Sequence, residues 1–533
     1  MALPGARWED APSNESPRPR PRPFTRTALF LAALSLLTIP PVVLAAMRTP
    51  AGSVFSGYVV IARDADVYQA LWRAGWHGAW LFQSAYTSEA LPGILLYPWY
   101  LWPAHLVGWA AGPWLYHLSR LAAAAALLTA VWLLIAELFR PLRLRRWAFA
   151  LCVLGGGIGA LLPRDIRLGP LVTHATEATS PGSSVADLVS MAPHLPWAMA
   201  LMCWSLVVAL RLRRGASRRL LVGGLCAIIG LQLIYPQLAL LATAVILGWS
   251  VARRRRAAGW FSLAAAGAQA PYLAYLLWVW HTTPAALRVI RPALEVGDPF
   301  GFLVLSHLVA SGLILIAIWR RRLRGDLLLP ALWIGGMTIF MFAPGISGVL
   351  GRSFMASSVP FGLCATPGLL ALVRAARSVA WRRRILVTTL AASSFFGIFS
   401  VAQPYWIAAF RLDPRAEYQS QAEAALLARL APRVSAHDVV LTTYLDGIFV
   451  PAQSDAHAFD GHPEMTIDAG RKADEALAFF TRWSAGERAT FLRANHIDYV
   501  LATDAGFVDR LGADPRLRLI DREGDAALFR VRP

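Results

Sequence analysis

Residues 114–138 read WLYHLSRLAAAAALLTAVWLLIAEL, an apolar run with Arg120 near its start, Glu137 near its end and no charge between them. A helix needs about 20 predominantly apolar residues to cross a bilayer. Comparable runs recur along the first three quarters of the 533-residue chain. The sequence therefore predicts a polytopic α-helical membrane protein.

The composition of the whole chain agrees with these runs. Hydrophobic residues make up 56% of it and charged residues 16%, and the mean hydropathy is +0.48. Soluble proteins have roughly 45–50% apolar and about 25% charged residues. The composition therefore excludes an ordinary soluble enzyme and a disordered chain. The four cysteines lie in apolar runs, so no disulfide framework is predicted.

The net charge of +19 is unevenly distributed. Residues 1–403 hold 36 Lys and Arg against 13 Asp and Glu, whereas residues 404–533 hold 15 against 19. The basic excess therefore belongs to the apolar part, where it forms short clusters between the runs. The positive-inside rule produces such a pattern, so we interpret the charge as membrane topology and expect no nucleic-acid partner. The clusters are Arg140–Arg146, Arg211–Arg219, Arg253–Arg256, Arg320–Arg324 and Arg374–Arg384.

All Arg clusters lie on the cytoplasmic side if an even number of membrane crossings separates each neighbouring pair. Most segments between two clusters can be divided into two helices, and the chain then has about eleven transmembrane helices. The predicted spans and breaks are 27–47, 114–138, 147–162, 193–210, a pair within 220–251 broken at Tyr235-Pro236, a pair within 258–319 around a loop, a pair within 327–375 divided near Pro344–Arg352, and 385–403.

The interval from 48 to 139 holds a second apolar stretch besides 114–138. This stretch contains Pro92, Pro98 and Pro103 with Tyr and Trp between them. Prolines interrupt a spanning helix, and aromatic residues favour the membrane interface. We therefore predict that 94–108 is an interfacial or re-entrant helix rather than a span.

This topology defines the domains. Residues 1–26 form a cytoplasmic Pro/Arg-rich leader, and residues 27–403 form the transmembrane domain with outer loops 48–113, 163–192 and 281–300. Residues 404–533 alternate β-like runs (DVVLTTY, GIFVPA, IDYVLAT, AALFRV) with helical stretches, which predicts an extracytoplasmic α/β domain. We expect a multi-pass protein of a bacterial-type inner membrane, with its N-terminus inside and its C-terminal domain outside.

The acidic residues of the membrane part favour chemistry at the outer face. A transporter is expected to carry ionisable groups within its spans, but Glu137 is the one acid that we place in a span, near its cytoplasmic end. Most other acids fall in the outer loops, at Asp64, Asp66, Glu89, Asp165, Glu177, Asp187, Glu295 and Asp298.

The first outer loop carries a recognisable series of residues. Asp64 is followed four positions later by Tyr68, then by the turn Gly78–Trp80, the aromatic stretch 94–108, and Arg120-Leu121 at the start of the next span. In this series the chain resembles the GT-C class of polytopic membrane glycosyltransferases, such as the bacterial aminoarabinose transferases and the protein O-mannosyltransferases. It departs from them at two places. The family's usual pair of acidic residues is replaced by Asp64-Ala65, and Leu91-Pro92-Gly93-Ile94, at the entry to the aromatic stretch, lacks the family's lysine.

The resemblance implies a polyprenyl-phosphate-linked sugar donor and sugar transfer outside the membrane. It also implies that the loop carboxylate is the general base for the acceptor hydroxyl. The chemistry of sugar transfer agrees: one carboxylate takes the acceptor proton, and cations or a divalent metal ion stabilise the leaving phosphate. Asp64 and Asp66, beside Arg63, are the catalytic candidates, although a solvated loop with a structural Arg–Asp pair is an alternative interpretation.

The other outer loops supply further candidates. Asp165 and Glu177 are candidates for a second acid or a metal ligand, in a loop whose polar residues also suit solvation and helix capping. Arg291 and Arg352 are predicted to lie on the outer side, against the positive-inside trend, and Arg pairs well with phosphate oxygens. They are therefore candidates for binding the donor phosphate, with headgroup anchoring as the alternative.

In the C-terminal domain, HAFDGHPEMT brings His457, Asp460, His462 and Glu464 close together in sequence. Their spacing matches no standard zinc pattern. A polar loop facing the membrane-domain site and a plain turn are both better interpretations than a metal site.

We therefore predict a hexosyl- or pentosyltransferase that uses a lipid-phosphate-linked sugar, with the surrounding membrane lipid as a further partner and an acceptor that the sequence does not identify. Alternatives are a non-catalytic or transport protein on the same scaffold, such as a lipid-linked sugar flippase or a polymer-export component, and a membrane acyl- or phosphotransferase. A divalent metal ion is left open as a cofactor.

Overall fold

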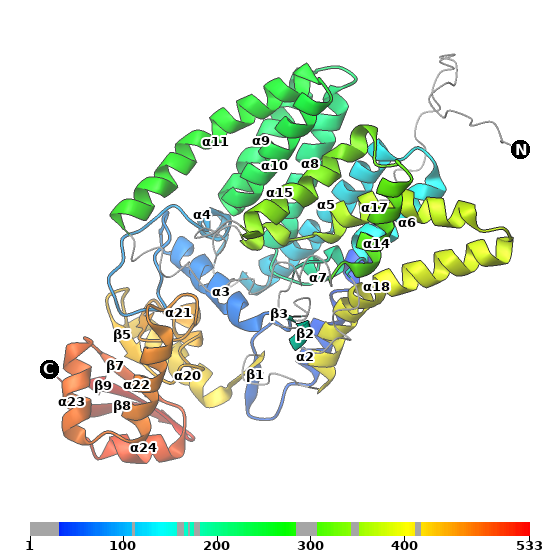
Figure 1. Ribbon diagram of the computed structural model, residues 1–533. Coiled ribbons are helices and arrows are strands. Elements are labelled where there is room, and N and C mark those ends of the chain that lie inside the picture. The colour runs from blue at the N-terminus through cyan, green and yellow to red at the C-terminus, as the bar shows by residue number, and fades with distance from the viewer. Residues whose placement is uncertain are drawn as a thin grey trace, which may run out of the picture.

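The computed structural model describes residues 31–108, 112–156, 165–168, 171–174, 182–283, 306–342, 351–410 and 417–532. The first part of the chain forms a bundle of helices, and the C-terminal α/β domain packs against one end of it (Figure 1). The helix α3 (Ala62–Trp76) and the segment after it lie between the two parts. The chain is thus mostly helical with a sheet-containing C-terminal region, and the exact domain boundaries stay a prediction.

The membrane part is helical over most of its described length, with one hairpin of β2 (Asp165–Leu168) and β3 (Leu171–His174). Among the described residues, four helices are long and apolar enough to cross a membrane, namely α5, α8, α17 and α18. The total of about eleven spans stays a prediction. The helices are α2 (Pro40–Met47), α3 (Ala62–Trp76), α4 (Pro98–Ala104), α5 (Gly112–Leu138), α6 (Leu142–Val153), α7 (Val185–Leu188), α8 (His194–Leu212), α9 (Arg218–Ile234), α10 (Pro236–Ala252), α11 (Arg256–Thr282), α14 (Leu308–Trp319), α15 (Leu328–Phe342), α17 (Ser358–Ala375) and α18 (Val379–Phe410), with short 3-10 turns η4 (Gly325–Leu327) and η5 (Gly351–Phe354).

The predicted break between α9 and α10 is confirmed. Tyr235 has an extended backbone, with φ −142° and ψ 91°, and Pro236 opens α10 as its first residue. A proline disfavours the helical conformation of the residue before it, and its own φ suits the first position of a new helix. The dipeptide alone therefore fixes this break.

Several helices differ from the predicted ranges: α18 (Val379–Phe410) extends beyond both ends of the predicted 385–403, and three others differ for local reasons. The first span is interrupted before α2, where Pro40 and Pro41 follow a turn. The helix α6 ends at Val153, ahead of Gly155 and Gly156, so it is shorter than the predicted 147–162. The interfacial helix is confined to α4, because Tyr97 has a left-handed backbone with φ 51° and Pro98 begins the helix there.

The C-terminal end of α5 is held by ion pairs. The Glu137 side chain is 8% exposed, and one of its oxygens lies 3.0 Å from Arg211 Nε. The other lies 2.8 Å from Arg214 and 3.9 Å from Arg213. Arg211 lies in the last turn of α8, and Arg213 and Arg214 follow that helix, which packs most extensively on α5. Glu137 is therefore a structural clamp at the end of α5.

The C-terminal domain contains a five-stranded sheet in the order β6-β5-β7-β9-β8. The strands β6, β5 and β7 are parallel, and β9 is antiparallel to both β7 and β8, with Val500 opposite Phe529. The elements are α20 (Gln421–Leu430), η6 (Ala431–Arg433), β5 (Val439–Leu441), α21 (Phe449–Gln453), β6 (His457–Ala458), α22 (Ala469–Thr481), α23 (Ala485–Ala494), β7 (Tyr499–Ala502), α24 (Ala505–Gly512), β8 (Leu517–Glu523) and β9 (Ala526–Val531).

Within this domain one predicted strand was wrong. GIFVPA, residues 447–452, contains helix α21 and no strand. Pro451 lacks the N–H that a central strand must donate, and a short apolar run does not distinguish a buried strand from a buried helix. The strand β8, whose LRLIDRE sequence is mostly polar and exposed, was not predicted.

The sheet packs on both faces, because successive strand residues point to opposite sides. Val439 and Leu441 contribute to a core with Phe479 and Phe480 of α22. Val440 belongs instead to the large core that continues into the membrane part. The α/β domain is thus joined to the helical bundle by continuous apolar packing.

A small two-stranded sheet also joins the two ends of the membrane part. In it β1 (Ser53–Phe55), just after the first span, pairs antiparallel with β4 (Tyr418–Ser420), which follows α18. The Tyr418 hydroxyl also donates to the Ala45 carbonyl at 3.0 Å. The first outer loop is therefore tied to the entrance of the C-terminal domain.

Candidate functional site

Helix α3 presents the two candidate acids of the first outer loop on opposite sides. It begins after Ile61, whose φ is 48°, and Asp64 lies in its first turn, where the helix dipole favours a negative charge. At about 100° per residue, positions two apart face nearly opposite directions. The Asp64 side chain is accordingly 43% exposed, whereas Asp66 is 5% exposed.

The burial of Asp66 gives it a different chemistry. Its Oδ2 has no hydrogen-bond partner among the described residues, and desolvation by burial raises the pKa of Asp66 well above its usual value. A raised pKa favours the neutral, protonated form of the carboxyl. Of the two predicted catalytic acids, Asp64 is the one whose surroundings leave it open to a substrate.

The Asp64 carboxylate contacts the C-terminal domain. Its Oδ1 lies 3.0 Å from Nε2 of His462, whose side chain is only 4% exposed. The other ring nitrogen, Nδ1, accepts the backbone N–H of Glu464 at 3.2 Å. Because Nδ1 accepts, the proton of the neutral imidazole lies on Nε2 and is donated to Asp64.

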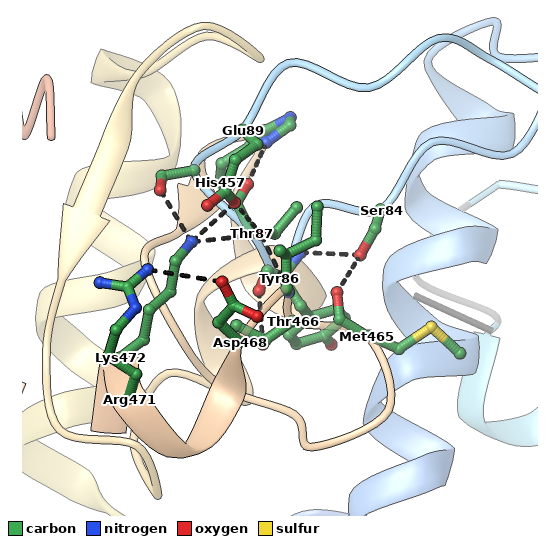
Figure 2. A network of polar contacts seen from close by, with 12 residues as sticks. Ser84, Tyr86, Thr87, Glu89, His457, Met465, Thr466, Asp468, Arg471 and Lys472 are labelled. Atoms are coloured by element: carbon green, nitrogen blue, oxygen red, sulfur yellow. Dashed lines mark hydrogen bonds and ion pairs between the residues drawn. The ribbon is translucent and has the colours of Figure 1, made fainter. Parts of the chain in front are cut away.

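The segment from Ser84 to Glu89 of the first outer loop forms the rest of this contact (Figure 2). The Ser84 hydroxyl donates to the Met465 carbonyl at 2.7 Å, and Thr466 donates to the Tyr86 carbonyl at 2.6 Å. The Tyr86 hydroxyl in turn donates to the Ile448 carbonyl at 3.1 Å. The residues that flank His462 are therefore hydrogen-bonded to the loop that follows α3.

Lys472, the one lysine of the sequence, closes the same contact. Its residue exposure is 1%, and Nζ lies 2.7 Å from a Glu89 oxygen and 2.9 Å from the Ser88 hydroxyl (Figure 2). Nζ is also 4.8 Å from the centre of the Phe459 ring. Burial favours a higher pKa for Glu89, but the bonds from Lys472 and Thr87 outweigh it and lower the pKa, so Glu89 is ionised.

A cluster of aromatic side chains packs between α3 and the helical bundle. Tyr68 stacks on Tyr100 of α4, with ring centres 4.5 Å apart. The Tyr100 hydroxyl is 2.7 Å from His194 Nδ1, and His194 Nε2 is 3.2 Å from the hydroxyl of Tyr235, at the break between α9 and α10. Tyr68, predicted from its spacing to Asp64, thus couples the helix that carries Asp64 to the interfacial helix and the bundle.

Arg120, the other residue that carried the resemblance, is structural. It is buried, and its guanidinium donates to the Thr38 carbonyl at 3.1 Å and to the Val189 carbonyl at 3.4 Å. A cavity of about 20 Å³ beside it is lined by residues that include Tyr58, Tyr116 and His117. Arg120 therefore ties the first span to the segment ahead of α8.

The remaining predicted site residues are only partly described. Asp165 lies in β2 and Arg352 in η5, and for both the structure describes the backbone alone. Glu177 and Arg291 lie outside the described residues. Their roles stay predictions.

HAFDGHPEMT does not gather a metal site in the part of the chain that the structure describes. No group of three His, Cys, Asp or Glu side chains there is arranged to hold a metal ion. Instead His457 bonds through Nδ1 to the Thr87 carbonyl at 3.0 Å, and His462 bonds to Asp64. The interpretation as a polar loop facing the membrane-domain site is the one that these contacts match.

Comparisons with known proteins agree with this architecture. No family model and no curated protein matches the chain. Among solved structures, the archaeal oligosaccharyltransferase AglB from Archaeoglobus fulgidus, in complex with an inhibitory peptide and a dolichol-phosphate, has a TM-score of 0.52 at 12% identity, over 90% of this chain and 69% of that chain. The Archaeoglobus fulgidus oligosaccharyltransferase tethered to an acceptor peptide containing the NVT sequon has a TM-score of 0.54, with the same identity and coverage. This chain therefore has the fold of the GT-C class of membrane glycosyltransferases, as its first outer loop predicted.

Proposed function

We propose that this protein is a glycosyltransferase that moves a sugar from a polyprenyl-phosphate-linked donor to an acceptor at the extracytoplasmic face of the membrane. The observation that carries the proposal is Asp64. It is an exposed carboxylate in the first outer loop of a GT-C fold, and it is held by a histidine from a second domain. Asp66, although only two positions away, lacks that exposure.

The chemistry assigned to Asp64 is proton removal from the acceptor. The acceptor oxygen or nitrogen attacks the anomeric carbon from the face opposite the lipid phosphate, so the configuration inverts. The bond from the sugar to the phosphate breaks, and the lipid phosphate leaves. A positioned carboxylate typically contributes about 10²- to 10⁴-fold to such a step.

The donor phosphate needs positive charge as it leaves. Arg352, with Arg291, is proposed to supply it, and Asp165 or Glu177 is proposed as a second acid or as a metal ligand. A divalent cation is an alternative source of that charge. Replacing Arg352 with Ala is expected to weaken donor binding, seen as a raised KM for the lipid-linked sugar.

Of the similar archaeal structures, one is a complex with a dolichol-phosphate and the other carries a tethered acceptor peptide. A lipid-linked donor is therefore the first class to test here, and a peptide is the first acceptor. Hexosyl or pentosyl specificity, and a location in a bacterial-type inner membrane with the C-terminal domain outside, complete the proposal.

The test is transfer of a labelled sugar from polyprenyl phosphate to endogenous acceptors or a sequon peptide, in membranes that contain the full chain. The unmutated protein should transfer label from at least one donor, and Asp64→Asn should abolish that transfer while Asp66→Asn impairs it less. If neither Asp variant is impaired, Asp64 is not the base. If no lipid-linked donor is used but label crosses the membrane, the protein is a flippase.

A further inference from the structure

The bond between His462 and Asp64 assigns the C-terminal domain a role in the site. We propose that His462 is a positioning residue, which holds the Asp64 carboxylate in the orientation that accepts the acceptor proton. The proposal rests on the proposed function, because it concerns the same carboxylate. It adds that the site is incomplete until the C-terminal domain is docked.

The geometry separates this bond from an ordinary surface contact. The His462 side chain is almost fully buried, so its ring cannot swing away without breaking packing. The bond from Glu464 N–H to Nδ1 fixes the proton on Nε2, and that proton points at Asp64 Oδ1. The buried His462 ring has one fixed orientation, so its N–H restricts the rotation of the Asp64 carboxylate but leaves that carboxylate partly exposed.

The orientation of Asp64 also has little support from its own helix. It lies in the first turn of α3, and α3 begins at a left-handed residue with no side-chain cap. A carboxylate on an uncapped first turn has several rotamers available. His462, at a sequence separation of 398 residues, is therefore the contact that selects one of them.

The contacts around His462 make its position depend on docking. The backbone N–H of His462 lies 3.3 Å from the Thr466 hydroxyl, and that hydroxyl donates to Tyr86 of the outer loop. On the other side, the backbone N–H of Ala458 donates to the Ala85 carbonyl at 2.8 Å. The residues on either side of His462 are thus hydrogen-bonded to the loop that leads out of α3.

Two substitutions at His462 separate its two bonds. Gln places its amide nitrogen near the position of Nε2, so His462→Gln keeps the donor to Asp64 and loses the acceptor for Glu464. Asn places its polar atoms near Nδ1, so His462→Asn keeps the acceptor and loses the donor. A hydrogen bond to a charged group typically contributes enough for roughly a 10- to 100-fold effect.

We expect His462→Asn to lower kcat roughly 10- to 100-fold with the donor KM changed less than about twofold, and His462→Gln to retain activity within about fivefold. A purely structural histidine gives a different result: the two variants then lose activity in proportion to their loss of thermal stability. Equal kcat for His462→Asn and the unmutated protein would overturn the proposal.

His457 provides the matched control. It belongs to the same short segment and bonds to the same outer loop, but through Nδ1 and to the Thr87 carbonyl. Here His457→Asn keeps the bond and His457→Gln loses it, the reverse of the pattern at His462. Both are expected to leave kcat within about twofold, so a loss of activity in either variant comparable to that of His462→Asn would contradict the proposal.

The same assay distinguishes this inference from the proposed function. If the unmutated protein transfers sugar and Asp64→Asn does not, but both His462 variants remain fully active, the function stands and the positioning role fails. If the unmutated protein transfers nothing from any lipid-linked donor, the function fails and the positioning role fails with it. In a double-variant cycle, His462→Asn should add less than about twofold to the loss in Asp64→Asn, because both act on one group.

Discussion

The two ends of the membrane part each hold a carboxylate against cationic or hydrogen-bonding side chains, and they do so differently. At the C-terminal end of α5, Glu137 is 8% exposed and both of its oxygens lie within ion-pair distance of arginines. At the end that contacts the C-terminal domain, the Asp64 side chain is 43% exposed and its Oδ1 contacts a histidine. The first carboxylate is buried among cations, and the second is partly open to solvent.

This difference shows how the surroundings separate a structural acid from a reactive one. A buried carboxylate that is ion-paired through both oxygens stabilises a fold but is shielded from a substrate. A carboxylate that is held at one oxygen and is partly exposed can take a proton from a substrate. By this criterion Glu137 closes a helix pair, and Asp64 is free to act.

The strongest test of the comparison is to neutralise each acid in turn. Asp64→Asn should lower sugar transfer by about 10²- to 10⁴-fold, since a general base is removed. Its thermal unfolding midpoint in detergent should stay close to that of the unmutated protein, because Asp64 is partly exposed. A large drop in the midpoint would place Asp64 in the structural class with Glu137.

Glu137→Gln should give the opposite pattern. Removing the charge leaves three arginines close together at the ends of α5 and α8, and should lower the free energy of unfolding by about 2–3 kcal/mol. Transfer per folded molecule should be unchanged. Thermal unfolding followed together with transfer activity checks both statements, and a selective loss of kcat would show that this end of the bundle takes part in catalysis.

Asp460 is a third carboxyl that differs from both: it is buried like Glu137, but no ion pair holds it among the described residues. Burial raises the pKa of Asp460 to about 6. A carboxyl whose pKa is higher in the folded state stabilises the fold below its unfolded pKa and loses that contribution as the pH rises through about 6. Asp460→Asn should therefore raise the free energy of unfolding at pH 7.5 by about 3 kcal/mol, and the gain should disappear below about pH 4. Unfolding midpoints measured across this pH range check the sign, and a gain that is independent of pH would contradict it.

Lys472 gives the smallest expected effect. Lys472→Met keeps the length of the side chain and its packing on Phe459, but removes the bonds to Glu89 and Ser88, and should weaken docking of the C-terminal domain by about 1 kcal/mol. Faster amide exchange in residues 84–89 would report this.

Arg471 is the control, because its ion pairs are exposed on α22 (Figure 2), so Arg471→Met should change the exchange rate little. Equal effects of the two substitutions on the exchange rate would show that Lys472 does not hold the C-terminal domain against residues 84–89.

The features predicted correctly from the sequence depend on local chemistry. The break at Tyr235-Pro236 follows from one dipeptide, and the span α5 follows from one uninterrupted apolar run. The candidate Asp64 also follows from a local signal, its position shortly after a span, although its catalytic role stays a prediction. Each of these needs only residues close together in the chain.

The features that were missed depend on contacts between distant residues. HAFDGHPEMT was recognised as polar and dense in potential ligands, but nothing near it indicates that His462 meets Asp64. The opposite faces of Asp64 and Asp66 became apparent only when α3 proved to be a helix rather than a loop. GIFVPA was assigned wrongly because its apolar pattern suits a buried strand and a buried helix equally.

The sequence separation of 398 residues between Asp64 and His462 has a consequence for the order of synthesis. Asp64 is made soon after the first span, long before α18 is inserted and before the C-terminal domain exists. If docking of that domain orients the carboxylate, the growing chain holds an unfinished site throughout membrane insertion. Activity would then arise only after the last span is in place, which protects the lipid-linked sugar pool from partly assembled protein.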